Sequence, residues 1–389
     1  MTAHKHLKSH VRLRMAKTGE SYTTALRHVL ARRPDTRPAA VLPGYTRFGG
    51  GLHHESATLS HVLAQAGIPL SEALLAGLGG GVGFMYFVFE YAGHHPMMTI
   101  VSQAHPRPML PQALDQAGIA YEVKRTGGAK TAERNLRATL AAGRAAVCRL
   151  EREVAVAGID GDTLYVDDQY VEPYPWPLAD FLTAWSAPRK NRHHLLAVTG
   201  DGHRDLGAAA RDAIADTVAR LTGPVLGNNF DVNFGLSGMR KLAAQLGDTK
   251  ARDGWARRFA APEAFFIGLT RLHDCLEIEY GAPGAMRPLY ADFLDEVGAA
   301  GAAGVYRRAG AAWSALARAA LPGDVPQFAR YREIAAEREL LRTTDRVRGA
   351  GRLRELDAEA AALPQAYAAG RPLAGGSSAG GSSVAGASA

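Results

Sequence analysis

The stretch Gly49–Ser56, GGGLHHES, comes directly before a segment with helical periodicity, and a second glycine cluster, GLGGGVGF, follows at Gly77–Phe84. The apolar residues after the first stretch have the spacing of one buried helix face, so the pattern predicts a helix over residues 54–66. The first turn of a helix presents unpaired N–H groups and the positive end of the helix dipole. Such a place stabilises a thiolate or an oxyanion. His53 and His54 occupy it, and the stretch therefore predicts the start of an active site.

The region up to residue 200 alternates helical and strand-like patterns. Ser71, followed by Glu72, is a typical start of a second helix. The sequence IDGD at 159–162 predicts a tight hairpin turn between two strands. The expected helices span 54–66, 71–78, 109–117, 130–142 and 177–186, and the expected strands span 84–91, 98–102, 120–123, 145–150, 154–158, 163–166 and 194–198. This order predicts an α/β domain in which helices come first and a largely antiparallel sheet follows.

The second half is predicted to be almost entirely helical, with segments separated by glycine and proline. These helices are expected at 204–222, 235–246, 262–280, 286–301, 303–320 and 325–345. The fold class is therefore α+β, an α/β domain followed by an all-helical domain. The expected organisation is a basic helical extension (1–33), a proline-rich linker (34–44), the α/β domain (45–200), the helical domain (201–346), a helical tail (347–369) and a disordered Gly/Ser/Ala tail (370–389).

The charge of the chain is concentrated at its N-terminus. The net charge is +7, and residues 1–33 alone carry eight Lys or Arg against one Glu, which accounts for the whole excess. We expect either a solvated helical hairpin or an arm that binds nucleic acid or an acidic protein. With two distant cysteines, no apolar run of membrane-spanning length and no signal-peptide pattern, a cytoplasmic protein is expected. The oligomeric state stays open, a homodimer included.

The glycine run and the paired histidines resemble ligand-binding motifs, but neither has the sequence context of a nucleotide or metal site. GLGGGVG has no Gly-Lys-Ser/Thr ending and follows a helix, so it is neither a P-loop nor a dinucleotide fingerprint. It predicts a tight helix-to-strand connection, and Gly79, Gly80 and Gly81 are candidates for letting a long substrate group pass close to the backbone. Three His-His pairs occur, but adjacent rings diverge on a strand or a helix, so no metal site is expected.

Several blocks in order resemble the butirosin biosynthesis protein H N-terminal domain family. The family reads Gly-x-His-Cys, then a helix, then a Ser-Glu block that ends in glycines. The matching residues are Gly51, His53, Ser71, Glu72, Gly77, Gly79, Gly80 and Gly81. The strand pair at Val154–Asp168 resembles a later segment of the family, and the helical half resembles the domain of unknown function that often follows. The resemblance covers about residues 45–345 and implies a papain-like fold for the first domain.

The resemblance also implies a chemistry, from which this chain departs at two positions. The namesake transfers an aminoacyl group from the phosphopantetheine thioester of an acyl carrier protein to an amine, through a cysteine. That cysteine corresponds to His54, the family's histidine falls near Arg152 or Glu153, and the orienting acid corresponds to Asp168. The candidate catalytic residues are therefore His54, His53, Asp168 and Glu153. Cys148 lies in a strand and is expected to be a core residue.

Three functions remain open at the level of the sequence. The first is an acyltransferase in which His54 or His53 acts as general base or transient acyl acceptor, with no bound cofactor and a carrier-protein thioester as substrate. The second is a non-catalytic scaffold that recruits an acidic partner, such as a carrier protein, or nucleic acid through residues 1–33. The third, a peptidase, agrees with the implied fold but lacks the nucleophile.

Overall fold

The computed structural model describes residues 38–202, 205–279, 281–344, 346 and 349–370. The expected basic extension and the end of the chain from residue 371 lie outside the described residues, so those predictions are not addressed by the structure. Within the described part, a sheet-rich first half is followed by a helical second half. The predicted α+β class is confirmed.

Six antiparallel strands form the larger sheet, in the order β3-β8-β4-β5-β6-β7. Their bounds are β3 Ile119–Lys124, β4 Ala146–Arg149, β5 Glu153–Asp160, β6 Thr163–Asp167, β7 Tyr174–Pro177 and β8 His194–Gly202. Alternating side chains face opposite sides of a strand, and here both sides are apolar. The central strands of this sheet are therefore buried on both faces.

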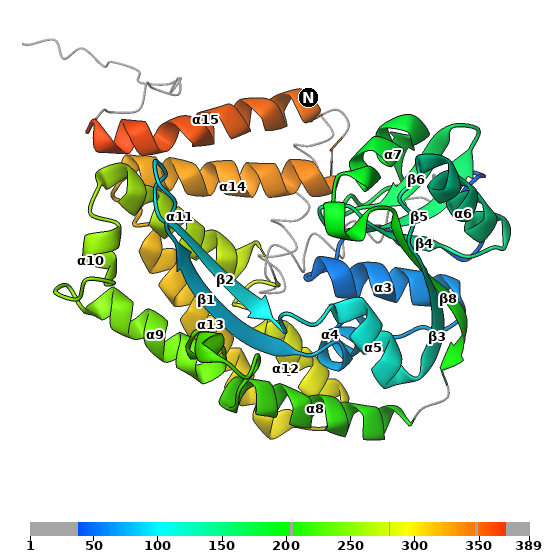
Figure 1. The fold of residues 1–389 in the computed structure, drawn as a ribbon, viewed down its shortest axis with the longest axis horizontal. Coiled ribbons are helices and arrows are strands. Elements are labelled where there is room, and N and C mark those ends of the chain that lie inside the picture. The colour runs from blue at the N-terminus through cyan, green and yellow to red at the C-terminus, as the bar shows by residue number, and fades with distance from the viewer. Residues whose placement is uncertain (1–37, 203–204, 280, 345, 347–348, 371–389) are drawn as a thin grey trace, which may run out of the picture.

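Helices cover each face of this sheet (Figure 1). On one face lie α3 (His54–Gln65), α4 (Glu72–Leu78) and α5 (Met109–Ala117), which share a core with alternate strand residues such as Val147. On the other face, α6 (Ala129–Ala141) and α7 (Leu178–Ser186) pack on the intervening residues, Cys148 among them. The alternation along β4 thus places neighbouring residues in two different cores.

A separate two-stranded sheet, β1 (Val82–Phe89) and β2 (Met97–Gln103), packs against helices of the second half. Its buried aromatic residues Phe84 and Tyr86 share a core with Trp255, and the Trp255 indole donates to the Tyr86 hydroxyl at 2.9 Å. The second half begins with the helices α8 (Leu206–Thr222), α9 (Gly235–Gly247), α10 (Trp255–Arg258), α11 (Pro262–Glu277), α12 (Arg287–Glu296) and α13 (Ala300–Ala320). In Figure 1 the hairpin lies alongside α9 and α11.

The connection from α4 to β1 contains the second glycine cluster. Ser71 caps α4, as predicted, because its hydroxyl accepts from the backbone N–H of Leu74 at 2.9 Å. Gly79, Gly80 and Gly81 then form the turn, and the Gly80 carbonyl accepts hydrogen bonds from α8. The run is therefore the tight helix-to-strand connection that the sequence indicates. A substrate-binding role for these three glycines stays a prediction.

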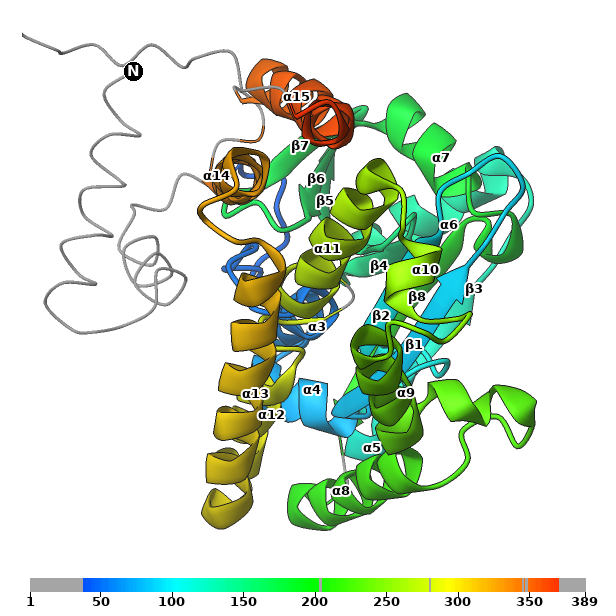
Figure 2. The same cartoon turned by 90° about the vertical axis from the view of Figure 1, so that its left-hand side faces the viewer.

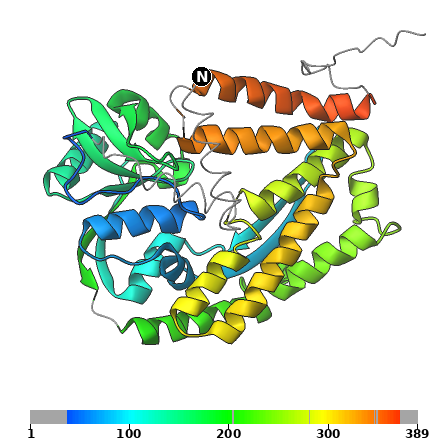
Figure 3. The same ribbon diagram turned by 180° about the vertical axis from the view of Figure 1, so that it is seen from behind.

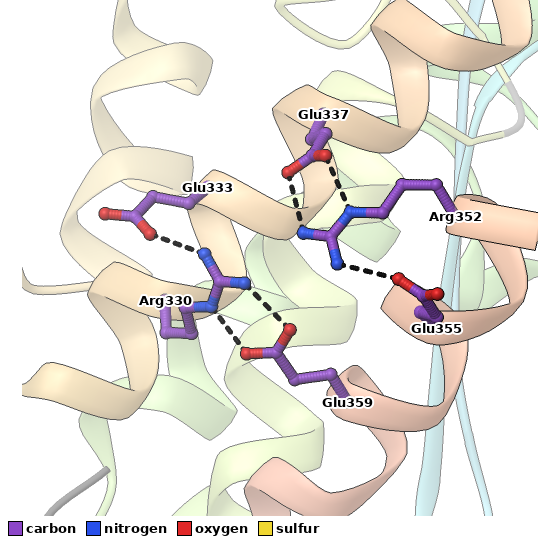
Figure 4. Close-up of polar contacts among 6 residues, drawn as sticks. All are labelled: Arg330, Glu333, Glu337, Arg352, Glu355 and Glu359. Atoms are coloured by element: carbon purple, nitrogen blue, oxygen red, sulfur yellow. Dashed lines mark hydrogen bonds and ion pairs between the residues drawn. The ribbon is translucent and has the colours of Figure 1, made fainter. Parts of the chain in front are cut away.

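The last two helices, α14 (Pro326–Thr344) and α15 (Ala350–Ala368), form a hairpin across one side of the molecule (Figures 2 and 3). A small core that includes Phe328, Ile334 and Leu356 joins them to α11. On the outer side, Arg330 pairs with Glu333 and Glu359, and Arg352 pairs with Glu337 and Glu355 (Figure 4). Exposed ion pairs of this kind contribute little each, so the apolar core is the main support of the hairpin.

Candidate functional site

The start of α3 is held by a residue from α4. His53 is the N-cap and is extended (φ −119°, ψ 118°), but its side chain makes no capping hydrogen bond. Instead, a Glu72 carboxylate oxygen accepts from the backbone N–H groups of Leu52 and His53, at 2.6 and 2.7 Å. A Cβ at Gly51 would lie 2.1 Å from the Cβ of Ala57, so only glycine fits this close turn. The turn therefore fixes His54 at the first helical position.

His54 lies against the start of β5. Its Nε2 contacts the backbone carbonyl oxygen of Glu153, and because a carbonyl oxygen only accepts, Nε2 carries the hydrogen. Nδ1 is then the nitrogen with the lone pair in the neutral ring. Burial lowers the pKa of His54 and outweighs the nearby charge of Asp168, which raises it. The structure thus places a neutral imidazole at the helix start.

Asp168, the expected orienting acid, is held by two arginines. Arg152 donates to both of its carboxylate oxygens, at 2.7 and 2.9 Å, and Arg346 donates to one of them. Burial alone would raise the pKa of Asp168, but the hydrogen bond and charge of Arg152 and the charge of Arg346 lower it to about 2. Asp168 is therefore an ionised carboxylate that neutralises guanidinium groups near His54.

Arg346 brings the second half of the chain to this site. Its guanidinium also lies over the Tyr174 ring, 4.5 Å from the ring centroid. Close by, the Thr343 carbonyl at the end of α14 accepts from the backbone N–H of Val171 at 3.0 Å. The end of α14 is thereby joined to the loop after β6.

His53 is buried beside the site and has two polar partners. Its Nδ1 lies 2.9 Å from the Ser56 hydroxyl, and its Nε2 lies 2.6 Å from Oε1 of Gln103 at the end of β2. With 3% of its surface exposed, it connects α3 to the two-stranded sheet. Burial lowers the pKa of His53, although Gln103 and Glu72 act against it. Its contacts are those of a buried support for the helix start.

Glu55, which no motif in the sequence singles out, lies near Glu153 in this site. Each glutamate is close enough to influence the pKa of the other. Arg149 lies 3.3 Å from Glu153. Burial raises the pKa of both glutamates, and the charge of Glu55 raises that of Glu153 further. The only signal in the sequence was an acidic residue in a first helical turn, which is commonly a partner of the helix dipole.

Neither cysteine can take the place of the family's nucleophile. Cys148 is fully buried on the face of the sheet that packs on α6 and α7, whereas His54 lies on the α3 side. Burial raises its pKa well above the ordinary value, so a reactive thiolate is disfavoured. Cys275 lies in α11, where burial raises the pKa to about 11. The prediction that Cys148 is a core residue is confirmed.

The structure brings all four candidate catalytic residues to one region, the start of α3 and the adjoining ends of β5 and β6. Over the described residues, no group of three His, Cys, Asp or Glu side chains is arranged to hold a metal ion. Within the same ranges, no helix combines the length and apolar character needed to cross a membrane.

Comparison with known proteins identifies one family. Residues 53–168 match the family model described as Butirosin biosynthesis protein H, N-terminal. The match begins at His53 and ends at Asp168, which are two of the candidate site residues. It confirms the resemblance, and the helical second half is consistent with the helical domain expected after it. No curated protein matches the chain.

Proposed function

We propose, from the membership of residues 53–168 in the butirosin biosynthesis protein H N-terminal family, that this chain transfers an acyl group from a thioester to an amine. The name of the family supports a role in natural-product biosynthesis. The family resemblance supports a carrier-protein thioester as the acyl donor. Because His54 stands where the family has cysteine, the transfer takes place directly, without an acyl-cysteine intermediate.

The observation that carries this proposal is the neutral imidazole of His54 at the start of α3. Its Nδ1 accepts a proton from the amine as the amine attacks the thioester carbonyl carbon. The N–C bond forms, the C–S bond breaks, and the leaving sulfur takes the proton back from the imidazolium and departs as a thiol. General-base catalysis of this kind contributes about 10²–10⁴-fold, and holding donor and acceptor together contributes further. The backbone N–H groups of the first helical turn and the positive end of the helix dipole support the negative charge that develops on the carbonyl oxygen.

The cysteine route of the family does not fit this site, because the corresponding side chains are engaged in other contacts. Asp168 is paired with Arg152 and Arg346. Cys148 is buried on the opposite face of the sheet. A hydrolytic cysteine peptidase would need the same parts, so the direct transfer is the better chemistry for this site.

The test is amide formation from acyl-carrier-protein or acyl-coenzyme A thioesters with a panel of amines. We expect transfer above the uncatalysed rate, and a fall of about 10²-fold or more in His54→Ala. His95→Ala is the matched control, since this histidine lies in the β1–β2 loop with 43% of its side chain exposed. Wild-type protein without transfer contradicts the proposed function, and undiminished transfer in His54→Ala contradicts the role of the imidazole.

A second candidate function is a non-catalytic scaffold that binds an acidic partner. The pairing of Asp168 with two arginines favours a scaffold, because a carboxylate held by arginines does not orient a catalytic base. The eight basic residues in 1–33 supply a region that attracts acidic proteins, such as a carrier protein, or nucleic acid. We expect full-length protein to retain an acidic partner in pull-down experiments. This binding should weaken as the salt concentration rises. Unchanged binding after deletion of residues 1–33 contradicts recruitment by this arm.

A further inference from the structure

A row of side chains crosses three neighbouring strands at the end of the six-stranded sheet where His54 lies. In the ladder, His194 at the start of β8 stands opposite Arg149 in β4, and Arg149 stands opposite Glu153 in β5. The backbone carbonyl of Glu153 contacts His54, so the row begins at the candidate site. Neighbouring strands are about 5 Å apart, which places His194 about 10 Å from Glu153 along the row.

The side chains of this row lie on the same face of the sheet as α3. Side chains alternate between the two faces along a strand. The next residues on the three strands, Leu195, Cys148 and Val154, belong to the core on the opposite face, against α6 and α7. Arg149 has 40% of its side chain exposed, so the row can be reached from solvent.

Four further cations surround the outer end of the row. Arg125 directly follows β3, which pairs with β8, and the other three lie in the segment that leads into β8. All four are exposed. Among the residues that the structure describes, none forms an ion pair with any of these four side chains. We call the whole set the basic edge, which consists of Arg125, Arg149, Arg189, Lys190 and Arg192.

The basic edge has little negative charge to balance it. Arg149 has one acidic partner, Glu153, at 3.3 Å. His194 adds no charge at neutral pH, because burial and then the charges of Arg125 and Arg149 lower its pKa to about 4. A surface with five cations and one paired acid attracts an acidic partner and orients it as it approaches. Its inner end is beside His54.

We propose that the basic edge is the docking surface for the acidic carrier protein that presents the acyl thioester to His54. This inference rests on the proposed function, in which the donor is a carrier-protein thioester. Two properties of the surface support it: its charge is opposite to that of the donor, and it is continuous with the candidate site. A partner docked on the edge lies within about 15 Å of Glu153, so an arm attached to the partner can extend along the row toward His54.

Nucleic acid fits the basic edge less well than an acidic protein does. Sites for single strands combine cations with exposed aromatic side chains on which bases stack. In the described part of the chain, the large exposed aromatic side chains lie elsewhere, on the β1–β2 hairpin, on η2 (Asn229–Asn233) and on α11. They are Phe89, Tyr91, Phe230 and Phe265.

Binding of a pantetheinylated acyl carrier protein of net negative charge to the full-length chain tests the surface without turnover. We expect binding to weaken as the salt concentration rises. We expect the triple variant Arg189→Glu, Lys190→Glu and Arg192→Glu to bind about 10-fold more weakly or worse, because the variant repels the partner. Arg125→Glu is a second variant in a different element and should weaken binding in the same direction. Melting temperatures show whether each variant is folded.

The matched control changes the net charge equally at a different place. It reverses three exposed arginines of α9, α10 and the turn between them, on a side of the molecule away from β8 in Figure 1: Arg240→Glu, Arg252→Glu and Arg257→Glu. All proteins keep residues 1–33, so the basic extension does not account for a difference between them. Equal binding by the two triple variants overturns the proposal. Tighter binding of a single-stranded oligodeoxynucleotide than of the carrier protein also overturns it.

Transfer rates with two donors separate docking from the chemistry of the site. For the carrier-borne donor, we expect the triple variant of the basic edge to raise KM by about 10-fold and to leave kcat unchanged. With an N-acetylcysteamine thioester, which has no protein part, we expect no change. An equal loss with both donors overturns docking. A wild type that binds the carrier through the basic edge but transfers no acyl group overturns the proposed function and confirms the docking surface.

Discussion

Replacing Asp168 by asparagine is expected to lower the free energy of unfolding by about 2 kcal/mol at neutral pH. Asp168 has 1% of its surface exposed, and its carboxylate accepts two hydrogen bonds from Arg152 and one from Arg346. Its pKa is lowered from the ordinary 3.8 to about 2, against burial, which alone would raise it. One pKa unit corresponds to about 1.4 kcal/mol, so ionised Asp168 stabilises the fold by about 2 kcal/mol.

The sign of the pH dependence follows from that lowered pKa. Between about pH 2 and pH 4, the unfolded chain holds more of the Asp168 proton than the folded chain does. The stabilisation is therefore complete above the unfolded pKa and is lost as the pH falls through the folded pKa. The difference in unfolding free energy between wild type and Asp168→Asn is expected to fall to roughly half near pH 3.

Urea unfolding followed by circular dichroism at pH 6 and pH 3 measures this difference. Asp162→Asn is the matched control, because Asp162 also pairs with an arginine but has 90% of its side chain exposed. We expect that control to change stability by less than about 1 kcal/mol. A difference for Asp168→Asn that is the same at both pH values, or no larger than that of the control, would show that the ionised Asp168 carboxylate does not stabilise the fold.

Three further predictions concern the packing. Cys148 is fully buried, so a thiol reagent followed by mass spectrometry should modify it only after denaturation; modification of folded protein contradicts its placement. Gly77→Ala should lower stability by about 1–3 kcal/mol in thermal unfolding, because its Cβ would lie 2.3 Å from a buried phenylalanine ring of α12. A Cβ at Gly127 meets nothing within 4 Å, so Gly127→Ala is the control and should leave stability nearly unchanged. Ile334→Ala should lower the free energy of unfolding, measured with a chemical denaturant, by about 2–5 kcal/mol, and Glu359→Gln should lower it by at most about 1 kcal/mol. Equal losses in the two variants would contradict the view that the apolar core supports α14 and α15.

Local signals in the sequence predicted most of the helices and strands. Ser71 and Glu72 marked the start of α4, and the helix expected over residues 109–117 is α5 with the same bounds. Strand β7, Tyr174–Pro177, was missed because it is short and contains two prolines. Proline is accepted there since β7 is the edge of the sheet and pairs only with β6.

The site was only partly predictable, because its decisive contacts join distant parts of the chain. The family pattern pointed to His54 and Asp168, and both lie there. Arg346, however, reaches Asp168 across 178 positions, and no local pattern in the sequence encodes that contact. Glu55 gave the ordinary signal of an acidic residue at a helix start, and only the fold shows that it lies near Glu153.

The proposed transfer depends on His54 being a neutral base with its hydrogen on Nε2. Nitrogen NMR of protein labelled at histidine, with the His54 signal assigned by its loss in His54→Gln, measures both properties. We expect the Nε2–H tautomer at pH 7 and a pKa below the ordinary 6.5, because burial disfavours the charged ring. A ring that is protonated at pH 7, or a hydrogen on Nδ1, would contradict it.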